Sequence, residues 1–346
     1  MKRLAIALVP ALLLTMAPRA GAQAPAAKGM KAHKIKVGGD GGWDYLTADP
    51  EGKRLYVSRG DRVIVVDTAA EKVVGEIPDT PGVHGIAVVP ELNRGFTSNG
   101  RDNSVTVFDL KTLKPVGARI KVGSNPDAIL YDPASKRVYT FNHGPSKDAT
   151  AIDPSAMAVA GTVPLEGTPE AGIGDGKGHV FVNIQDKGEV VEFDGKTLKV
   201  LNRYSLAPGQ RPSGIGYDPE THRLFSICSN QKMMVLDAEN GKVVAEVPIG
   251  RGTDGGGYDP ATGNAFSSNG QDGTLSVVRQ TSPGKYEVVA TVPTQTSART
   301  MTFDPKTHRV YLSAAEMQPV PAGQPQPKGR GRRPIVPGSF CIIVVE

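Results

Sequence analysis

The chain has 346 residues, with 41 glycines, 28 prolines and a formal net charge of +5. Glycine and proline weaken helix interiors, so this composition favours short strands joined by tight turns over a helical protein. The positive charge does not indicate a uniform nucleic-acid-binding surface, because it is concentrated in two segments. Without Lys2, Arg3 and Arg19 it falls to about +2, and without four basic residues near the C-terminus it falls to about −2.

Residues 1–22 have the pattern of a secretory signal peptide. Lys2 and Arg3 precede an apolar run over residues 4–17, and Ala20-Gly21-Ala22 supplies the small residues that a signal peptidase accepts. The run is shorter than the roughly 20 residues that a membrane span needs. We therefore predict cleavage after Ala22, a periplasmic or secreted protein, and no transmembrane segment in the processed chain. The alternative is that the segment stays uncleaved as a membrane anchor. Residues 23–32 are expected to form a flexible lead-in.

A repeat then runs through the chain. Its clearest phrase is an aromatic-Asp-Pro turn followed by a basic residue and an aromatic strand, as in Tyr131-Asp132-Pro133 before Tyr139. Seven copies are recognisable, anchored at Pro50, Pro90, Pro133, Gly176, Pro219, Pro260 and Pro305. Their separations of 40 to 45 residues match one four-stranded propeller blade per copy. The sequence therefore predicts an all-β, seven-bladed β-propeller, with residues 33–346 forming a single domain.

The two ends of this domain are expected to close the ring. The last repeat stops after its third strand, at residues 340–345, and residues 33–37 have the character of a missing outer strand. Pairing these two segments would protect both sheet edges. Cys228 and Cys341 then fall in blades five and seven, which are not neighbours, so no disulfide is expected between them.

The second strands carry a family resemblance. The segments Tyr56-Val57-Ser58-Arg59, Phe96-Thr97-Ser98-Asn99 and Tyr139-Thr140-Phe141-Asn142 approximate the tetrapeptide of the YVTN-repeat, or YncE-like, β-propellers of bacterial exported proteins. The chain resembles that family over nearly all of its length after the signal. The paired Gly-His and Trp-Asp signatures of WD40 repeats, which have a similar period, are absent, and the only tryptophan is Trp43. The resemblance implies the fold and little about activity.

One face of the ring is the expected binding site. In a propeller, the loops that lead into each innermost strand and the hairpins between the second and third strands open on the same face. Aligning the first of these positions predicts a ring of Asp44, His84, Asp127, Glu170, Ser213, Asp254 and Arg299. Its carboxylates should raise one another's pKa or attract a cation; alternatively they point into solvent or cap local backbone.

No resident metal or other cofactor is assigned, although carboxylates with one imidazole could hold a divalent cation. The histidines outside this ring are expected to be harder to recruit, since three of the four lie near the turn into a second strand, on the opposite face. These four histidines are His143, His179, His222 and His308.

The seventh repeat carries a Pro/Gly/Arg-rich insertion at residues 317–339, between its second and third strands. Its basic residues are Lys328, Arg330, Arg332 and Arg333. We hypothesise that this partner loop folds over the acidic mouth as a lid or contacts an anionic partner. The alternative is a solvated insertion, because long surface loops cost little stability.

Motifs for catalysis are sparse. The sequence has no Gly-x-Ser-x-Gly, His-Glu-x-x-His or phosphate-loop pattern. This favours a non-enzymatic, monomeric binding or scaffold protein that recognises a small molecule, a glycan or a protein, and nucleic acid is not an expected partner. The alternative is an enzyme of the lyase or lactonase type that uses His84 as its catalytic residue, with or without a divalent cation.

Overall fold

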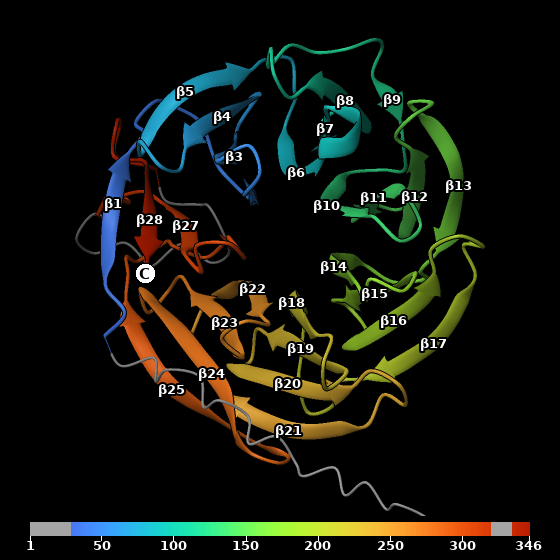
Figure 1. Ribbon diagram of the computed structural model, residues 1–346, viewed down its shortest axis with the longest axis vertical. Coiled ribbons are helices and arrows are strands. Elements are labelled where there is room, and N and C mark those ends of the chain that lie inside the picture. Colours follow the sequence, from blue (N-terminus) through green and yellow to red (C-terminus); the bar gives the residue numbers. More distant parts are fainter. Residues whose placement is uncertain (1–28, 320–333) are drawn as a thin grey trace, which may run out of the picture.

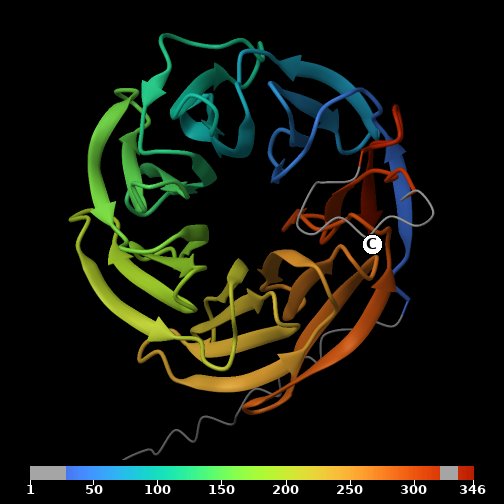
Figure 2. The same cartoon turned by 180° about the vertical axis from the view of Figure 1, so that it is seen from behind.

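The computed structural model describes residues 29–319 and 334–346. Seven antiparallel sheets of four strands each are arranged radially around a central axis, and the view from behind shows the same ring (Figures 1 and 2). Within the described residues the one helical element is a short 3-10 turn, η1 (Pro90–Leu92). The predicted seven-bladed propeller is confirmed.

The blades are numbered along the chain, and their strands run from the axis outward. Blade 1 contains β2 (Leu46–Asp49), β3 (Arg54–Arg59), β4 (Arg62–Asp67) and β5 (Lys72–Ile77). Blade 2 contains β6 (Val83–Val89), β7 (Arg94–Asn99), β8 (Ser104–Asp109) and β9 (Ile120–Lys121). Blade 3 contains β10 (Pro126–Asp132), β11 (Arg137–Asn142), β12 (Asp148–Asp153) and β13 (Ala158–Pro164).

Blade 4 contains β14 (Pro169–Gly174), β15 (His179–Ile184), β16 (Glu189–Asp194) and β17 (Val200–Ser205). Blade 5 contains β18 (Pro212–Asp218), β19 (Arg223–Cys228), β20 (Lys232–Asp237) and β21 (Val243–Pro248). Blade 6 contains β22 (Thr253–Asp259), β23 (Asn264–Asn269), β24 (Thr274–Ser282) and β25 (Lys285–Pro293). Blade 7 contains β26 (Met301–Phe303), β27 (Val310–Ala314), β28 (Cys341–Val345) and β1 (Ala32–Lys36).

The repeated Asp-Pro phrase forms the turn between the first and second strands of a blade. The side chain of Asp132 accepts a hydrogen bond from the backbone N–H of Ser135 at 2.8 Å, and Asp304 accepts one from Lys306 at 2.8 Å. An aspartate in this position satisfies turn donors that no strand partner can reach. The phrase that revealed the repeat is therefore also the device that reverses the chain.

Each apolar cluster is shared between neighbouring blades. Tyr139 of blade 3 packs edge-on against Phe193 of blade 4, with ring centroids 5.3 Å apart. In the same cluster, Gly172 leaves room for the ring of Phe141, which a β-carbon at that position would strike. Because each blade buries its faces only against its neighbours, the core depends on the ring being complete.

The ring is closed by strand β1, as the sequence predicts. β1 pairs antiparallel with β28, with His33 opposite Val344 and Ile35 opposite Ile342. Ile35 is 3% exposed and lies in a cluster with side chains of blades 1 and 7. The pairing joins segments from opposite ends of the sequence, so it fastens the first blade to the last.

Replacing Ile35 with alanine should weaken this closure. Removal of a buried isoleucine side chain typically costs about 2–5 kcal/mol of unfolding free energy. Denaturant unfolding of Ile35→Ala should show the loss, whereas Lys36→Ala, at the exposed next residue of the same strand, should unfold like the parent protein. Equal stability of the two variants would contradict a role for β1 in closure.

Both cysteines are buried and free, Cys228 in β19 and Cys341 in β28. Burial raises the pKa of the Cys228 thiol to about 12 and also raises that of Cys341. The thiolate is the reactive form, so neither side chain is suited to redox or nucleophilic chemistry at neutral pH.

Thiol titration should confirm this. In the folded protein both cysteines should react slowly with a disulfide reagent at pH 8, and in denaturant two thiols per chain should react at once. Fewer than two thiols under non-reducing denaturing conditions would show that a disulfide had formed.

No helix in the described part of the chain is long and apolar enough to cross a membrane.

Candidate functional site

The seven predicted ring residues lie where the chain enters each innermost strand, at one end of the central channel. In blades 2 to 6 these residues fall in a β-bulge, where pairing with the second strand is interrupted between the first residue of the strand and the fourth. A bulge leaves residues unpaired and re-aims their side chains. His84, Asp127, Glu170, Ser213 and Asp254 all occupy this position.

His84 connects two of the ring carboxylates. Its Nδ1 donates a hydrogen bond to Asp44 Oδ2 at 2.7 Å and lies 3.4 Å from Asp127 Oδ1. Burial would lower the pKa of His84, but the hydrogen bond to Asp44 and the charges of both carboxylates outweigh it and raise the pKa to about 9. The imidazole is therefore positively charged at neutral pH.

Arg299 connects Asp44 to the carboxylate of the sixth blade. Its guanidinium lies 3.1 Å from Asp44 Oδ1 and 2.8 Å from Asp254 Oδ2, and it also donates to the carbonyl oxygen of Trp43. Burial would lower the pKa of Arg299, but the charges of Asp44 and Asp254 raise it. Arg299 therefore stays charged and balances both acids.

Ser213 belongs to the ring by position but not by contact. Its side chain is buried and its hydroxyl donates to the carbonyl oxygen of Ile227 at 3.5 Å. Its own carbonyl oxygen accepts a hydrogen bond from the amide of Asn183. The structure thus brings six of the seven ring residues into the charged array at the mouth and directs Ser213 to the blade interior.

Two further residues, His143 and Gln185, complete the array and were not among the predicted ring residues. His143 Nδ1 lies 3.4 Å from Asp127 Oδ2 and 3.6 Å from Glu170 Oε1, and the amide of Gln185 donates to Glu170 Oε1. The expectation that His143 would be hard to recruit was wrong. It follows the last residue of β11, so it lies on the hairpin side of the blade, facing the ring.

Aligning a second position of the repeat identifies His143 and Gln185. The first residue after each second strand shares this face, and in the seven blades it is Gly60, Gly100, His143, Gln185, Ser229, Gly270 and Ala315. Most of these residues are small, because a larger ring residue needs the space: a β-carbon on Gly100 would lie 2.7 Å from Nε2 of His84. Only blades 3 and 4 carry long polar side chains both at the ring position and at the position after the second strand.

The remaining predicted histidine positions are confirmed. His179, His222 and His308 lie at the other end of the blades, beside acids of the turns there. His308 Nδ1, for example, lies 2.9 Å from Asp259 Oδ2. These histidines are structural partners of the turns and do not reach the mouth.

The expectation that the ring carboxylates raise one another's pKa fails for Asp127. Burial would raise its pKa, but contact with His143 and the charges of His84 and Arg299 hold the pKa below its usual value. The acids are interleaved with positive groups from neighbouring blades. Asp127 therefore stays ionised although only 14% of its side chain is exposed.

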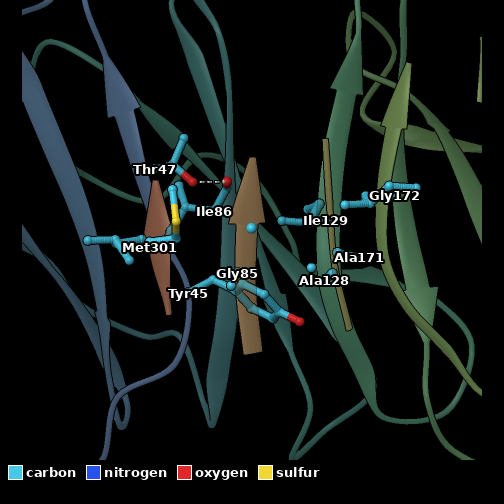
Figure 3. A pocket seen from close by; sticks show the side chains of 14 residues that line it. Tyr45, Thr47, Gly85, Ile86, Ala128, Ile129, Ala171, Gly172 and Met301 are labelled. Carbon is cyan, nitrogen blue, oxygen red and sulfur yellow. Dashed lines mark hydrogen bonds between the residues drawn. The ribbon is translucent and has the colours of Figure 1, made fainter. Parts of the chain in front are cut away.

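A cavity of about 160 Å³ lies directly below the array, inside the channel (Figure 3). Most residues that follow a ring residue are small, and this leaves the space: Gly85, Ala128, Ala171, Gly214 and Gly255. Tyr45 is the exception. Its hydroxyl donates to Glu170 Oε2 at 3.4 Å, and because blades 1 and 4 are not neighbours, this side chain crosses the channel.

A larger hollow of about 820 Å³ opens at the opposite end, between blades 1 and 7. It is lined by the Asp-Pro turns of both blades, including Lys53, Lys306 and Arg309, together with Glu346. None of the array residues contributes to it.

The described ends of the basic insertion extend blade 7 at the mouth end. The backbone N–H of Gln318 donates to the carbonyl oxygen of Pro334 at 2.8 Å, and that of Val336 donates to Glu316 at 2.8 Å. Lys328, Arg330, Arg332 and Arg333 lie outside the described residues. The predicted lid or partner contact of this loop stays a prediction.

Fold and site together define a seven-bladed propeller with a charged array at one mouth of its channel. Comparison with solved structures finds a similar chain in the Kuenenia stuttgartiensis hydrazine synthase, with a TM-score of 0.71 over 80% of this chain and 94% of that one. The two are 19% identical, so the similarity shows the fold alone. No protein-family model matches the sequence, and no curated protein matches it.

Arg299 should be important for stability as well as for the charge of the mouth. Replacing it with methionine leaves Asp44 and Asp254 without their shared cation, and Asp254 is only 3% exposed in its side chain. Removing one partner of a largely buried ion pair should cost about 2–4 kcal/mol, somewhat below the value for a fully buried pair. Urea unfolding of Arg299→Met should show this loss, and the exposed ion pair of Arg101 with Asp61 supplies the control variant Arg101→Met.

Proposed function

We propose that this chain is an exported propeller that binds a small polar ligand at the channel mouth. The observation that carries the proposal is the charged array itself. Ionisable side chains from six blades converge there over a cavity, although each has to be held against its neighbours at a cost in desolvation. Convergent polar groups at a concave site with shifted pKa values are typical of ligand binding.

Two further observations support the finer parts of the proposal. The YVTN-like tetrapeptides of the second strands suggest the YncE-like family of exported propellers, and the signal-like pattern of residues 1–22 suggests a periplasmic or secreted location. The small volume below the array favours a ligand of few atoms, or one group of a larger glycan or peptide, over a flat protein surface.

A specific contact favours a second candidate function, an enzyme of the lyase or lactonase type. The 2.7 Å hydrogen bond between His84 and Asp44 fixes the imidazole as it would be fixed in a catalytic pair. The raised pKa of His84 suits it to donating a proton rather than accepting one. In the described part of the chain its polar side-chain contacts are carboxylates and not a nucleophile, which is why we place binding first.

The proposal is tested by a thermal-shift screen of sugars, lactones and amino and organic acids. A ligand of the folded state raises the unfolding free energy by about 2.7 kcal/mol at 100 times its Kd. We expect at least one compound to stabilise the parent protein, and Asp127→Asn and His84→Ala to abolish the shift. The control His308→Ala removes a histidine–carboxylate contact at the opposite end and should retain it.

Two outcomes separate the candidates. A hit that shifts all variants equally would place the binding site away from the mouth and contradict the proposal. Hydrolysis of a lactone, or formation of an unsaturated product, would establish the enzymatic alternative if the activity disappears in folded His84→Ala.

A further inference from the structure

The contacts around His143 differ in kind from the others in the array. His84 and Arg299 each have at least one carboxylate partner within normal hydrogen-bonding range, Asp44 at 2.7 Å and Asp254 at 2.8 Å respectively. His143 Nδ1 instead lies 3.4 Å from Asp127 Oδ2 and 3.6 Å from Glu170 Oε1. These three side chains point their ligand atoms at one another from distances too long for strong hydrogen bonds.

Two polar atoms of these side chains are also shielded, one of them the Asp127 oxygen that faces His84. His143 Nδ1 and Asp127 Oδ1 are buried from solvent, and neither makes a hydrogen bond of good geometry within residues 29–319 and 334–346. A buried polar atom without a hydrogen bond costs about 1–3 kcal/mol, so the arrangement needs a reason. A cation between the ligand atoms would supply one.

The separations match metal coordination. Two ligand atoms, each about 2.1 Å from a tetrahedral metal ion, lie roughly 3.4 Å apart. Asp127, His143 and Glu170 each offer one ligand atom, and the three atoms lie within 4.8 Å of one another. We infer that His143 Nδ1, Asp127 and Glu170 form a binding site for a divalent first-row transition metal such as Zn²⁺.

The donor set indicates which cation. An imidazole with two carboxylates suits zinc and its neighbours, whereas calcium requires six to eight oxygen ligands, more than these residues provide. Three protein ligands leave a coordination position for water or for an exogenous group. This position would face the mouth, where the proposed ligand binds, but the metal site does not depend on that function.

Neighbouring residues are placed to hold the ligands. The amide of Gln185 donates to Glu170 Oε1, and Tyr45 donates to its other oxygen at 3.4 Å. His84 Nδ1 lies 3.4 Å from Asp127 Oδ1, too far for a strong hydrogen bond but close enough for an attraction between charges. Hydrogen bonds such as that from Gln185 orient metal ligands, and their loss typically weakens metal binding by about 10–100-fold.

A second group of three, Asp44, His84 and Asp127, also has metal-ligand spacing. We place the ion at His143 instead, for two reasons. Asp44 and His84 already share a 2.7 Å hydrogen bond, and Arg299 lies 3.1 Å from Asp44. A cation there would have to displace a proton and sit against a guanidinium, which like-charge repulsion opposes.

The test is a zinc titration of the chelator-treated chain, without a histidine tag, by competition with a fluorescent zinc chelator and by metal analysis after gel filtration. We expect one Zn²⁺ per chain and no comparable binding of Ca²⁺. His143→Ala and the isosteric Asp127→Asn should weaken zinc binding more than about 100-fold, and Gln185→Ala about tenfold or more. His308→Ala, which alters the opposite end, should bind zinc like the parent protein.

Three results would overturn the inference. They are the absence of stoichiometric zinc binding to the parent chain, unchanged binding in folded His143→Ala, and loss of binding in His84→Ala but not in His143→Ala. Circular-dichroism melting establishes which variants are folded, and Asp127→Asn answers the question if His143→Ala is not. Small-molecule stabilisation of the metal-free protein is measured separately, so failure of either proposal can be told from failure of the other.

Discussion

The convergence of seven innermost strands on one axis is the constraint on which the rest of the structure depends. Strands that approach so closely leave little room for side chains between them: a β-carbon on Gly216 would lie 2.7 Å from the backbone of Gly257 in the next blade. Small residues are therefore needed where neighbouring innermost strands come closest, and the long charged side chains of the array lie at the mouth. The β-bulges of blades 2 to 6 occur at this transition and turn the ring residues outward from the ladder.

Crowding at the mouth also explains the alternation of charge. Four carboxylates lie close together there, and their mutual repulsion would raise their pKa values if nothing intervened. The fold interposes Arg299 between Asp44 and Asp254, and His84 between Asp44 and Asp127. Interleaving of this kind gives specificity of arrangement more readily than stability, because each buried charge must first lose its water.

The sequence predicts the fold more fully than the site because the two depend on different kinds of information. Blade number and closure follow from the spacing of Asp-Pro turns and from an unpaired strand at residues 33–37, and both are periodic signals. The ring positions follow from the same period, so Asp44, His84, Asp127, Glu170, Asp254 and Arg299 could be found. His143 and Gln185 could not be found by aligning that single position, since they project from a different strand of the blade.

The direction of individual side chains is a second feature of the site that the sequence could not predict. Ser213 shares the ring position, yet its hydroxyl is directed to Ile227, and Tyr45 crosses the channel to Glu170 although it occupies the wall position. Neither direction follows from a repeat, because each depends on the neighbouring blade. In the array, Arg299 and the protonated His84 lie at hydrogen-bonding distance from the acids of blades 1 and 6. The contacts of His143 with Asp127 and Glu170 are longer, at 3.4 and 3.6 Å. A divalent cation bound there would neutralise the charges of Asp127 and Glu170, so the metal-loaded mouth would accept an anionic ligand more readily than the metal-free mouth.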